Sequence, residues 1–205
     1  MGKLVMAISF ALALGLPVAA APLIPEGYRE WEKTTSDLLN YPIPGHLDHY
    51  RIPYINSIGT GVTVETKGGR RTYTYPKGTI IVKEAYQGLE APKPGDKPVL
   101  IYAMIKDPGN PKARGGWVWV LKDVVAGKEA VYQSPLCVDC HSAANESFPY
   151  GDKNPNSDFR DYVFFPYKNK PMSISLCWSL MNRRTCFPDH QNVFSLLRQI
   201  DSRPP

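Results

Sequence analysis

The run Cys137-Val138-Asp139-Cys140-His141 constrains this chain more than any other feature of the sequence. Two thiols three residues apart can each add to one vinyl group of a haem, and the next histidine is then placed to ligate the iron. A thioredoxin-like redox pair would instead stand near the start of a strand–helix unit, and a structural zinc site would need a second pair of ligands. A disulfide between Cys137 and Cys140 would leave His141 unused. The motif therefore predicts one covalently attached haem c, with Cys137 and Cys140 as attachment points and His141 as the iron ligand.

The first twenty residues have the pattern of a secretory signal peptide. Lys3 gives a positive start, Leu4 to Leu16 is apolar and too short for a membrane span, and Val18-Ala19-Ala20 offers a small-x-small cleavage site. An uncleaved anchor is the alternative interpretation. We predict a signal peptide at 1–20, a periplasmic or secreted protein, and no membrane span once the signal is removed.

The other two cysteines, Cys177 and Cys186, lie in the last part of the chain. In an oxidising compartment such a pair is typical of a disulfide that closes a small loop. We therefore predict a C-terminal extension at 167–205 that carries this disulfide and forms a flap or a dimer contact.

The charge of the chain excludes one class of partner. The formal net charge is +5, and no block of like charges occurs. This mild surplus predicts no nucleic-acid site.

The pattern along the chain predicts an α+β fold. Helical spacing over 26–39 predicts an N-terminal helix that ends before Pro42. Alternating and β-branched segments then predict strands, and their short links favour an antiparallel sheet. A short strand and turn is predicted at 51–58. Further strands are predicted at 62–64, 73–75, 79–86, 99–106 and 117–121, with short helices at 173–180 and 193–200. Because the haem motif follows this sheet, the chain does not fit the small helical cytochromes that carry the motif near their N-terminus.

Several segments, taken in order, carry a resemblance to a known family. The strongest is Pro76-Lys77-Gly78-Thr79-Ile80-Ile81-Val82-Lys83-Glu84; the others are 27–31, 54–56, 104–106, 116–119, 137–141 and 161–164. Together they resemble the cytochrome P-460 family, which includes the cytochromes c′-beta, over about residues 25–166. The resemblance implies a haem domain at 21–166, commonly a homodimer, in which His141 is the proximal ligand of a five-coordinate haem.

The resemblance also implies roles for three further residues. In the enzymes of this family a lysine at the position of Lys83 is bonded to the porphyrin, and an arginine at the position of Arg51 lies near the open face of the haem. Tyr102 stands where hydroxylamine-oxidising members have a carboxylate that relays protons. A tyrosine with a pKa near ~10 is a poor base at neutral pH, so Tyr102 is a departure from the pattern. Glu84 or Asp107 would be the alternative proton acceptors.

Pattern alone leaves the surroundings of several side chains open. Alternation puts Lys83 on one face with Ile81, but neither face of this strand is uniformly apolar, so Lys83 either points to solvent or is held for a purpose. His46 and His49 flank Asp48, and two histidines rarely suffice for zinc. We therefore interpret that segment as a loop at the haem edge or in solvent. Met104, Met172 and Met181 are candidate sixth ligands for which core packing is the simpler role.

Three functions remain for such a chain. The first is oxidation of hydroxylamine at an open haem site, with electrons passed to a soluble cytochrome. The second is binding of nitric oxide without turnover, which Tyr102 favours. The third is plain electron transfer, which needs a sixth protein ligand on the iron. We favour the first because of Lys83.

Overall fold

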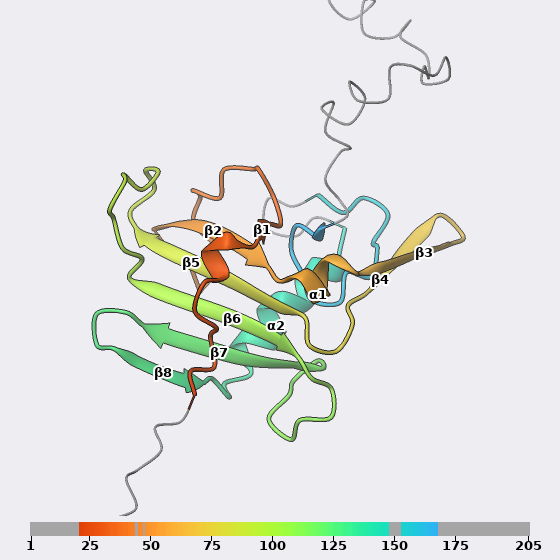
Figure 1. Cartoon of the computed structure of the whole chain (residues 1–205). Helices are drawn as coiled ribbons and strands as arrows, with labels where there is room; N and C mark the ends of the chain where they lie inside the picture. Colours follow the sequence, from red (N-terminus) through yellow and green to blue (C-terminus); the bar gives the residue numbers. More distant parts are fainter. Residues whose placement is uncertain (1–20, 44, 47, 148–152, 168–205) are drawn as a thin grey trace, which may run out of the picture.

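The structure is a computed structural model that describes residues 21–43, 45–46, 48–147 and 153–167 (Figure 1). The expected signal peptide, the Cys177–Cys186 disulfide and the two expected C-terminal helices lie outside these residues. Within the described part of the chain, no helix has the length and apolar character needed to cross a membrane.

Six strands form one antiparallel sheet in the order β1-β2-β5-β6-β7-β8 (Figure 1). Their bounds are β1 Glu32–Lys33, β2 His49–Ile55, β5 Ile80–Gln87, β6 Leu100–Lys106, β7 Trp117–Asp123 and β8 Lys128–Val131. The hairpin of β3 (Thr63–Lys67) and β4 (Arg70–Thr74) pairs separately and projects beside this sheet. The described helical segments are short: η1 Tyr28–Glu30, α1 Ser57–Thr60, α2 Leu136–Ser142 and η2 Ala143–Asn145.

The predicted strands are confirmed in the central part of the sheet. The expected strands at 79–86, 99–106 and 117–121 correspond to β5, β6 and β7, which pair as an antiparallel meander. Strand β8 was not predicted, because it is short, begins with the charged Lys128 and Glu129, and lies at the edge of the sheet that the described residues form.

The expected helix over 26–39 is wrong. Only Tyr28–Glu30 forms a single 3-10 turn, which Gly27 precedes with a left-handed φ of 77°. The chain then extends, and Glu32 and Lys33 pair with Ile55 and Tyr54 of β2. The Thr-Thr-Ser-Asp run at 34–37 has low helix propensity, so pairing with the sheet edge outweighs the apolar spacing of the segment.

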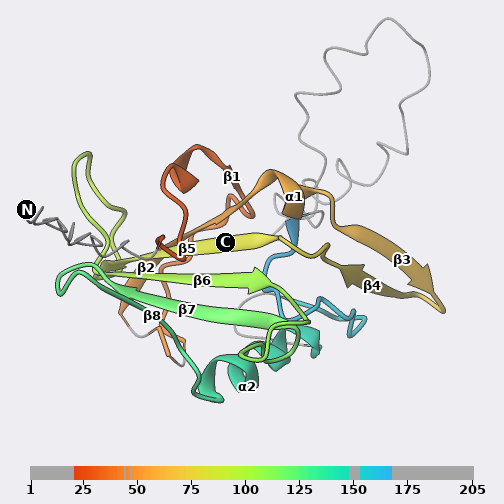
Figure 2. The ribbon, with the colours of Figure 1, turned by 60° about the horizontal axis from the view of Figure 1, so that its bottom comes forward.

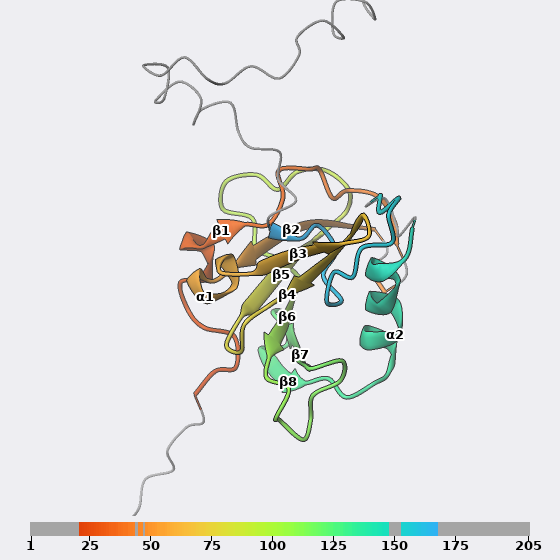
Figure 3. The same cartoon turned by 90° about the vertical axis from the view of Figure 1, so that its right-hand side faces the viewer.

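The two faces of the sheet carry separate apolar cores, and different elements cover them. Figures 2 and 3 show α2 on one side of the sheet and η1 with β1 on the other. The core on the η1 side includes Tyr28, Tyr54, Val82 and Val118. The core on the α2 side is built by Ile55, Val62, Tyr73, Tyr75, Ile81, Met104, Trp117, Trp119 and Val163.

The segment 158–163 closes the α2 side. It lies against the β3–β4 hairpin, where Phe159 accepts a backbone hydrogen bond from Tyr73 over 2.8 Å. The buried Asp158 carboxylate accepts from the Arg71 backbone and side chain, each over 2.8 Å. Asp161 forms an ion pair with Lys106 of β6, with both carboxylate oxygens 2.7 Å from Nζ. The end of the described chain is thereby fixed to both the hairpin and the sheet.

Candidate haem site

Helix α2 presents the Cys-x-x-Cys-His motif to a pocket. Positions three and four apart lie on one side of a helix, so Cys137, Cys140 and His141 face the same way. All three line the pocket between α2 and the sheet, and both cysteines are free thiols. The helix begins directly after Pro135, which cannot donate a backbone hydrogen bond and is favoured near helix starts.

His141 is held in a single orientation. Its Nδ1 lies 2.8 Å from the Tyr162 carbonyl oxygen, which can only accept, so Nδ1 carries the proton. The rings of Trp119 and Phe164 pack edge-on against the imidazole, at centroid distances of 4.8 and 5.3 Å. Burial, together with the charge of Lys83, lowers the pKa of His141 to about 3. His141 is therefore a neutral imidazole with Nε2 as its metal-binding nitrogen, which is the arrangement of an oriented iron ligand.

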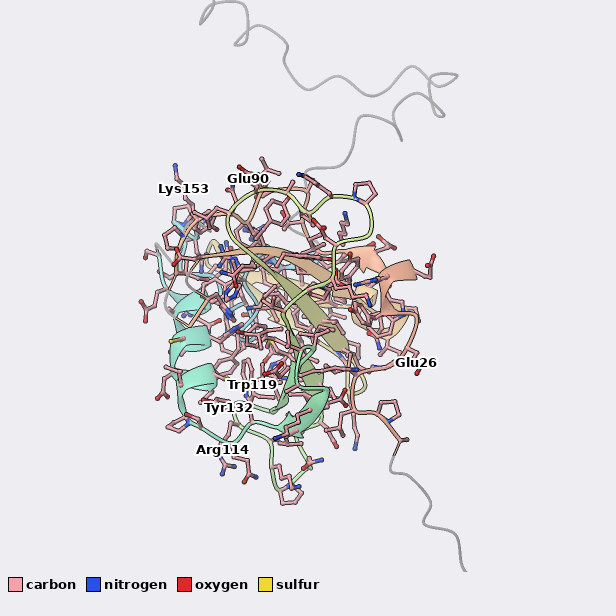
Figure 4. The ribbon with its side chains drawn as sticks, turned by 90° about the vertical axis from the view of Figure 1, so that its left-hand side faces the viewer. Glu26, Glu90, Arg114, Trp119, Tyr132 and Lys153 are labelled. Atoms are coloured by element: carbon pink, nitrogen blue, oxygen red, sulfur yellow. The ribbon has the colours of Figure 1, made fainter. Side chains whose placement is uncertain are left out.

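The opposite wall of the pocket is the sheet. One cross-strand row runs through Pro53, Lys83, Tyr102 and Leu121, and the next runs through Ile81, Met104 and Trp119. All seven side chains line the pocket. Trp119 and Tyr132, which lie close together in Figure 4, form its β7–β8 side. Met104 belongs to the apolar core of this face, as expected for a packing residue.

Lys83 points into this pocket, on the same face as Ile81, while Val82 and Glu84 face the other way. Its Nζ lies 2.6 Å from His46 Nε2 and 5.2 Å from the centre of the Tyr102 ring. Burial, and then the charge of Arg51, lower the pKa of Lys83 to about 7. A lysine in these surroundings has a substantial fraction of neutral, nucleophilic amine at neutral pH. The alternative of a solvent-facing lysine does not hold.

Arg51 is buried at the edge of the pocket, and its guanidinium donates hydrogen bonds to backbone carbonyls. Its Nε donates to the Leu39 carbonyl over 3.2 Å, and Nη2 donates to the Tyr41 carbonyl over 2.7 Å. The guanidinium also lies over the Tyr41 ring at 5.0 Å. Burial lowers the pKa of Arg51 from its usual value. Arg51 thus fixes the loop before β2 and adds positive charge to the pocket.

Tyr102 lines the pocket, but no carboxylate does so within the described residues. Burial raises the pKa of Tyr102, so even less of it is ionised and able to accept a proton at neutral pH than of an exposed tyrosine. Glu84 accepts hydrogen bonds on the opposite face of the sheet, and Asp107 pairs with Lys77 at the surface. The two carboxylates considered as substitutes for the missing proton acceptor therefore lie outside the pocket.

His46 is a pocket residue whose position the sequence left open. It lies in the loop before β2 and packs edge-on against Tyr102, with ring centroids 4.5 Å apart. Burial and the nearby charge of Lys83 lower the pKa of His46 far below its usual value, so the ring is neutral. The one signal in the sequence was that His46 lies five residues before Arg51. Because His46 is in a loop, no helical or strand periodicity could predict which way its side chain points.

These residues fit a haem. Two free thiols and an oriented neutral imidazole stand on one wall, and the facing wall is apolar around Ile81 and Met104. No cluster of three or more His, Cys, Asp or Glu side chains suited to a metal occurs in the described ranges. The residues that would hold the group are His141 for the iron and Cys137 and Cys140 for the porphyrin.

Two comparisons with known proteins bear on this site. A search of curated proteins finds no match. The family model described as Cytochrome P460 matches residues 25–165, which include every pocket residue described above. With this match over most of its length, and with the motif, Lys83 and the sheet in one pocket, the chain belongs to the cytochrome P460 family.

Proposed function

We propose that this protein is an exported mono-haem c-type cytochrome that oxidises hydroxylamine at an open distal site. The haem would be bound through Cys137 and Cys140, with His141 as the proximal ligand. The observation that carries the proposal is that Lys83 lines the same pocket as these three residues. A partly neutral amine on the wall facing the motif is the nucleophile needed for a bond to the porphyrin. That bond would replace one amine N–H and one porphyrin C–H, and the two electrons released would pass to an external two-electron oxidant.

The protein's own contribution would be orientation, charge and exclusion of water. When bound, the haem supplies the redox chemistry, and its properties are tuned by the residues around it. His141 is held by the Tyr162 carbonyl and by two aromatic rings, which fixes the axial ligand. Arg51 would favour a ligand that becomes negative, and Tyr102 would offer a hydroxyl over the haem.

The reaction needs partners that the chain itself does not contain. Oxidation of hydroxylamine to nitric oxide releases one proton with each electron. We propose that a soluble acceptor cytochrome takes the electrons in the periplasm or outside the cell. The motif lies on α2, at the outside of the sheet (Figure 3), where an acceptor could approach. We further propose a homodimer, as the family resemblance implies.

The absorption spectrum of the ferrous protein tests the proposal. A Soret band moved strongly to the red is expected for the wild type, and Lys83→Met should return the band to an ordinary c-type position with unchanged haem content. Mass spectrometry of haem peptides should find the Lys83 peptide joined to haem only in the wild type. Lys77→Met is the matched control, since the Lys77 side chain is 72% exposed and pairs with Asp107. Identical spectra for the wild type and Lys83→Met would contradict the proposal.

A second candidate is binding of nitric oxide without turnover. It is favoured by one observation: no Asp or Glu of the described residues lines the pocket, so a strong proton acceptor is missing. Turnover assays with hydroxylamine and an artificial electron acceptor separate the two functions. Tight nitric oxide binding without any reduction of the acceptor would favour the second.

A further inference from the structure

His46 has one ring nitrogen engaged and one without a partner. Nε2 lies 2.6 Å from Lys83 Nζ. Nδ1 is buried and makes no hydrogen bond within the described part of the chain. Buried polar atoms almost always have a partner, so an unpaired one at the wall of a pocket points to a partner outside the chain.

The hydrogen bond to Lys83 sets the chemistry of the unpaired nitrogen. A lysine ammonium has donors and no acceptor, so when Lys83 is protonated Nε2 of His46 accepts and the ring proton stands on Nδ1. A lysine nitrogen bonded to the porphyrin retains an N–H that donates in the same way. In both states Nδ1–H is a donor that awaits an acceptor.

Two other donors of the pocket are already used. Arg51 donates to two backbone carbonyls, and His141 donates to Tyr162. Much of the remaining lining is apolar, including Ile81, Met104 and Phe165. A small oxygen-bearing molecule in this pocket would therefore find a hydrogen-bond donor in His46, beside the hydroxyls of Tyr102 and Thr34.

We infer that His46 binds the distal ligand, with Nδ1–H donating a hydrogen bond to the oxygen of a nitrogen oxide or of hydroxylamine on the iron. This rests on the proposed function, because it requires a haem with an open face opposite His141. The bond would favour ligands that carry an acceptor oxygen over ligands of the same size without one. It also gives the pocket a polar contact that no carboxylate supplies.

The test uses the haem-loaded, ferrous full-length protein and nitric oxide as the probe. A hydrogen bond to the ligand oxygen lowers the N–O stretching frequency, so His46→Leu should raise that frequency. The dissociation constant should rise roughly tenfold, the equivalent of one hydrogen bond. His46→Gln retains an N–H donor and should recover most of the wild-type affinity.

His49 provides the matched control. Its Nδ1 is also buried without a hydrogen-bond partner, but His49 does not line the pocket. His49→Leu should therefore leave both the frequency and the affinity unchanged. A measurement on the wild type alone needs no variant: exchange into D2O should shift the N–O band if an exchangeable proton is donated to the ligand.

The outcomes separate this inference from the proposed function. A wild type that binds nitric oxide with no D2O shift, and with the same affinity in His46→Leu, would overturn the role of His46 alone. A low-spin wild type that becomes high-spin in His46→Leu would make His46 an iron ligand and would overturn both. A wild type that does not turn over hydroxylamine, but for which the expected frequency shifts are seen, would overturn only the proposed reaction.

Discussion

At the scale of single residues, Glu84 is a buried carboxylate on the face of the sheet opposite the pocket. It has no exposed surface, and its carboxylate accepts from Tyr28 over 2.7 Å, Tyr86 over 2.8 Å and Tyr54 over 3.3 Å. Arg29 donates to it over 2.6 Å. A buried carboxylate with this many donors is satisfied in place, so removal of its charge leaves several hydroxyls without an acceptor.

Glu84→Gln should lower the free energy of unfolding by about 3 kcal/mol. The amide NH2 would replace a carboxylate oxygen and would face tyrosine hydroxyls that now donate to that oxygen. Arg29→Gln should cost about 1 kcal/mol or less, since the Arg29 side chain is 52% exposed and water screens its charge. Urea denaturation of both variants checks the difference. Equal losses would mean that the ion pair, and not the tyrosine hydroxyls, satisfies the carboxylate.

The sequence alone could not predict that Lys83 faces the pocket or that His46 contacts it. Alternation placed Lys83 with Ile81, which the structure confirms, but only the position of α2 tells which face holds the pocket. His46 contacts Lys83 across 37 positions of sequence. A contact of that separation arises from the pairing of β2 with β5, so no local pattern contains it.

At the scale of elements, the segment 158–163 decides how the α2 side is closed. Its Asp161 has a φ of 52°, and the side chains of the Asp161–Lys106 pair are only 7% and 14% exposed. The next residue, Tyr162, provides the carbonyl that orients His141. The ion pair thereby connects the sheet to the ring that would hold the iron.

Asp161→Asn should destabilise the protein by about 3–5 kcal/mol, because it leaves Lys106 buried without its partner. Asparagine tolerates positive φ, so the effect comes from the lost charge and not from backbone strain. Thermal unfolding provides the measurement. Asp107→Asn breaks the exposed pair with Lys77 and should leave the midpoint unchanged; a matching loss there would contradict the argument.

Elements were predicted well where the pattern was local and poorly where tertiary contacts decided. Strands β5, β6 and β7 contain many β-branched or aromatic residues and lie within the sheet, so pattern and environment agree. The segment 26–39 has helical spacing, yet it follows the edge of β2. The contact of Phe159 with the β4 strand joins residues far apart in sequence and has no signature in either segment.

At the scale of the whole molecule, the β3–β4 hairpin and the chain segment after α2 depend on one another. A two-stranded sheet alone is marginally stable, and this hairpin gains its packing from the α2-side core and from Asp158. Burial alone would raise the pKa of Asp158, but the hydrogen bonds and the charge of Arg71 outweigh it and lower the pKa.

This coupling predicts a loss of stability in acid. A carboxylate with a lowered folded-state pKa stabilises the protein above its unfolded pKa of about 3.9, and this stabilisation is lost as the pH falls below that value. Asp158→Asn should cost about 1–2 kcal/mol at pH 7, and the difference from the wild type should shrink towards pH 3. Unfolding curves across this range check it; a constant difference would mean that the Asp158 charge contributes nothing.

The neighbouring side chains Lys83 and Glu84 have a consequence for folding. A one-residue slip of β5 would exchange the two faces of the strand. It would then drive the ammonium among the tyrosines and the carboxylate into the apolar pocket. Each error buries a charge among the wrong partners, so the pair strongly disfavours misregistered states of the sheet. Lys83, which faces the pocket, and Glu84, which faces the opposite core, thereby favour the native register of β5 while the protein folds.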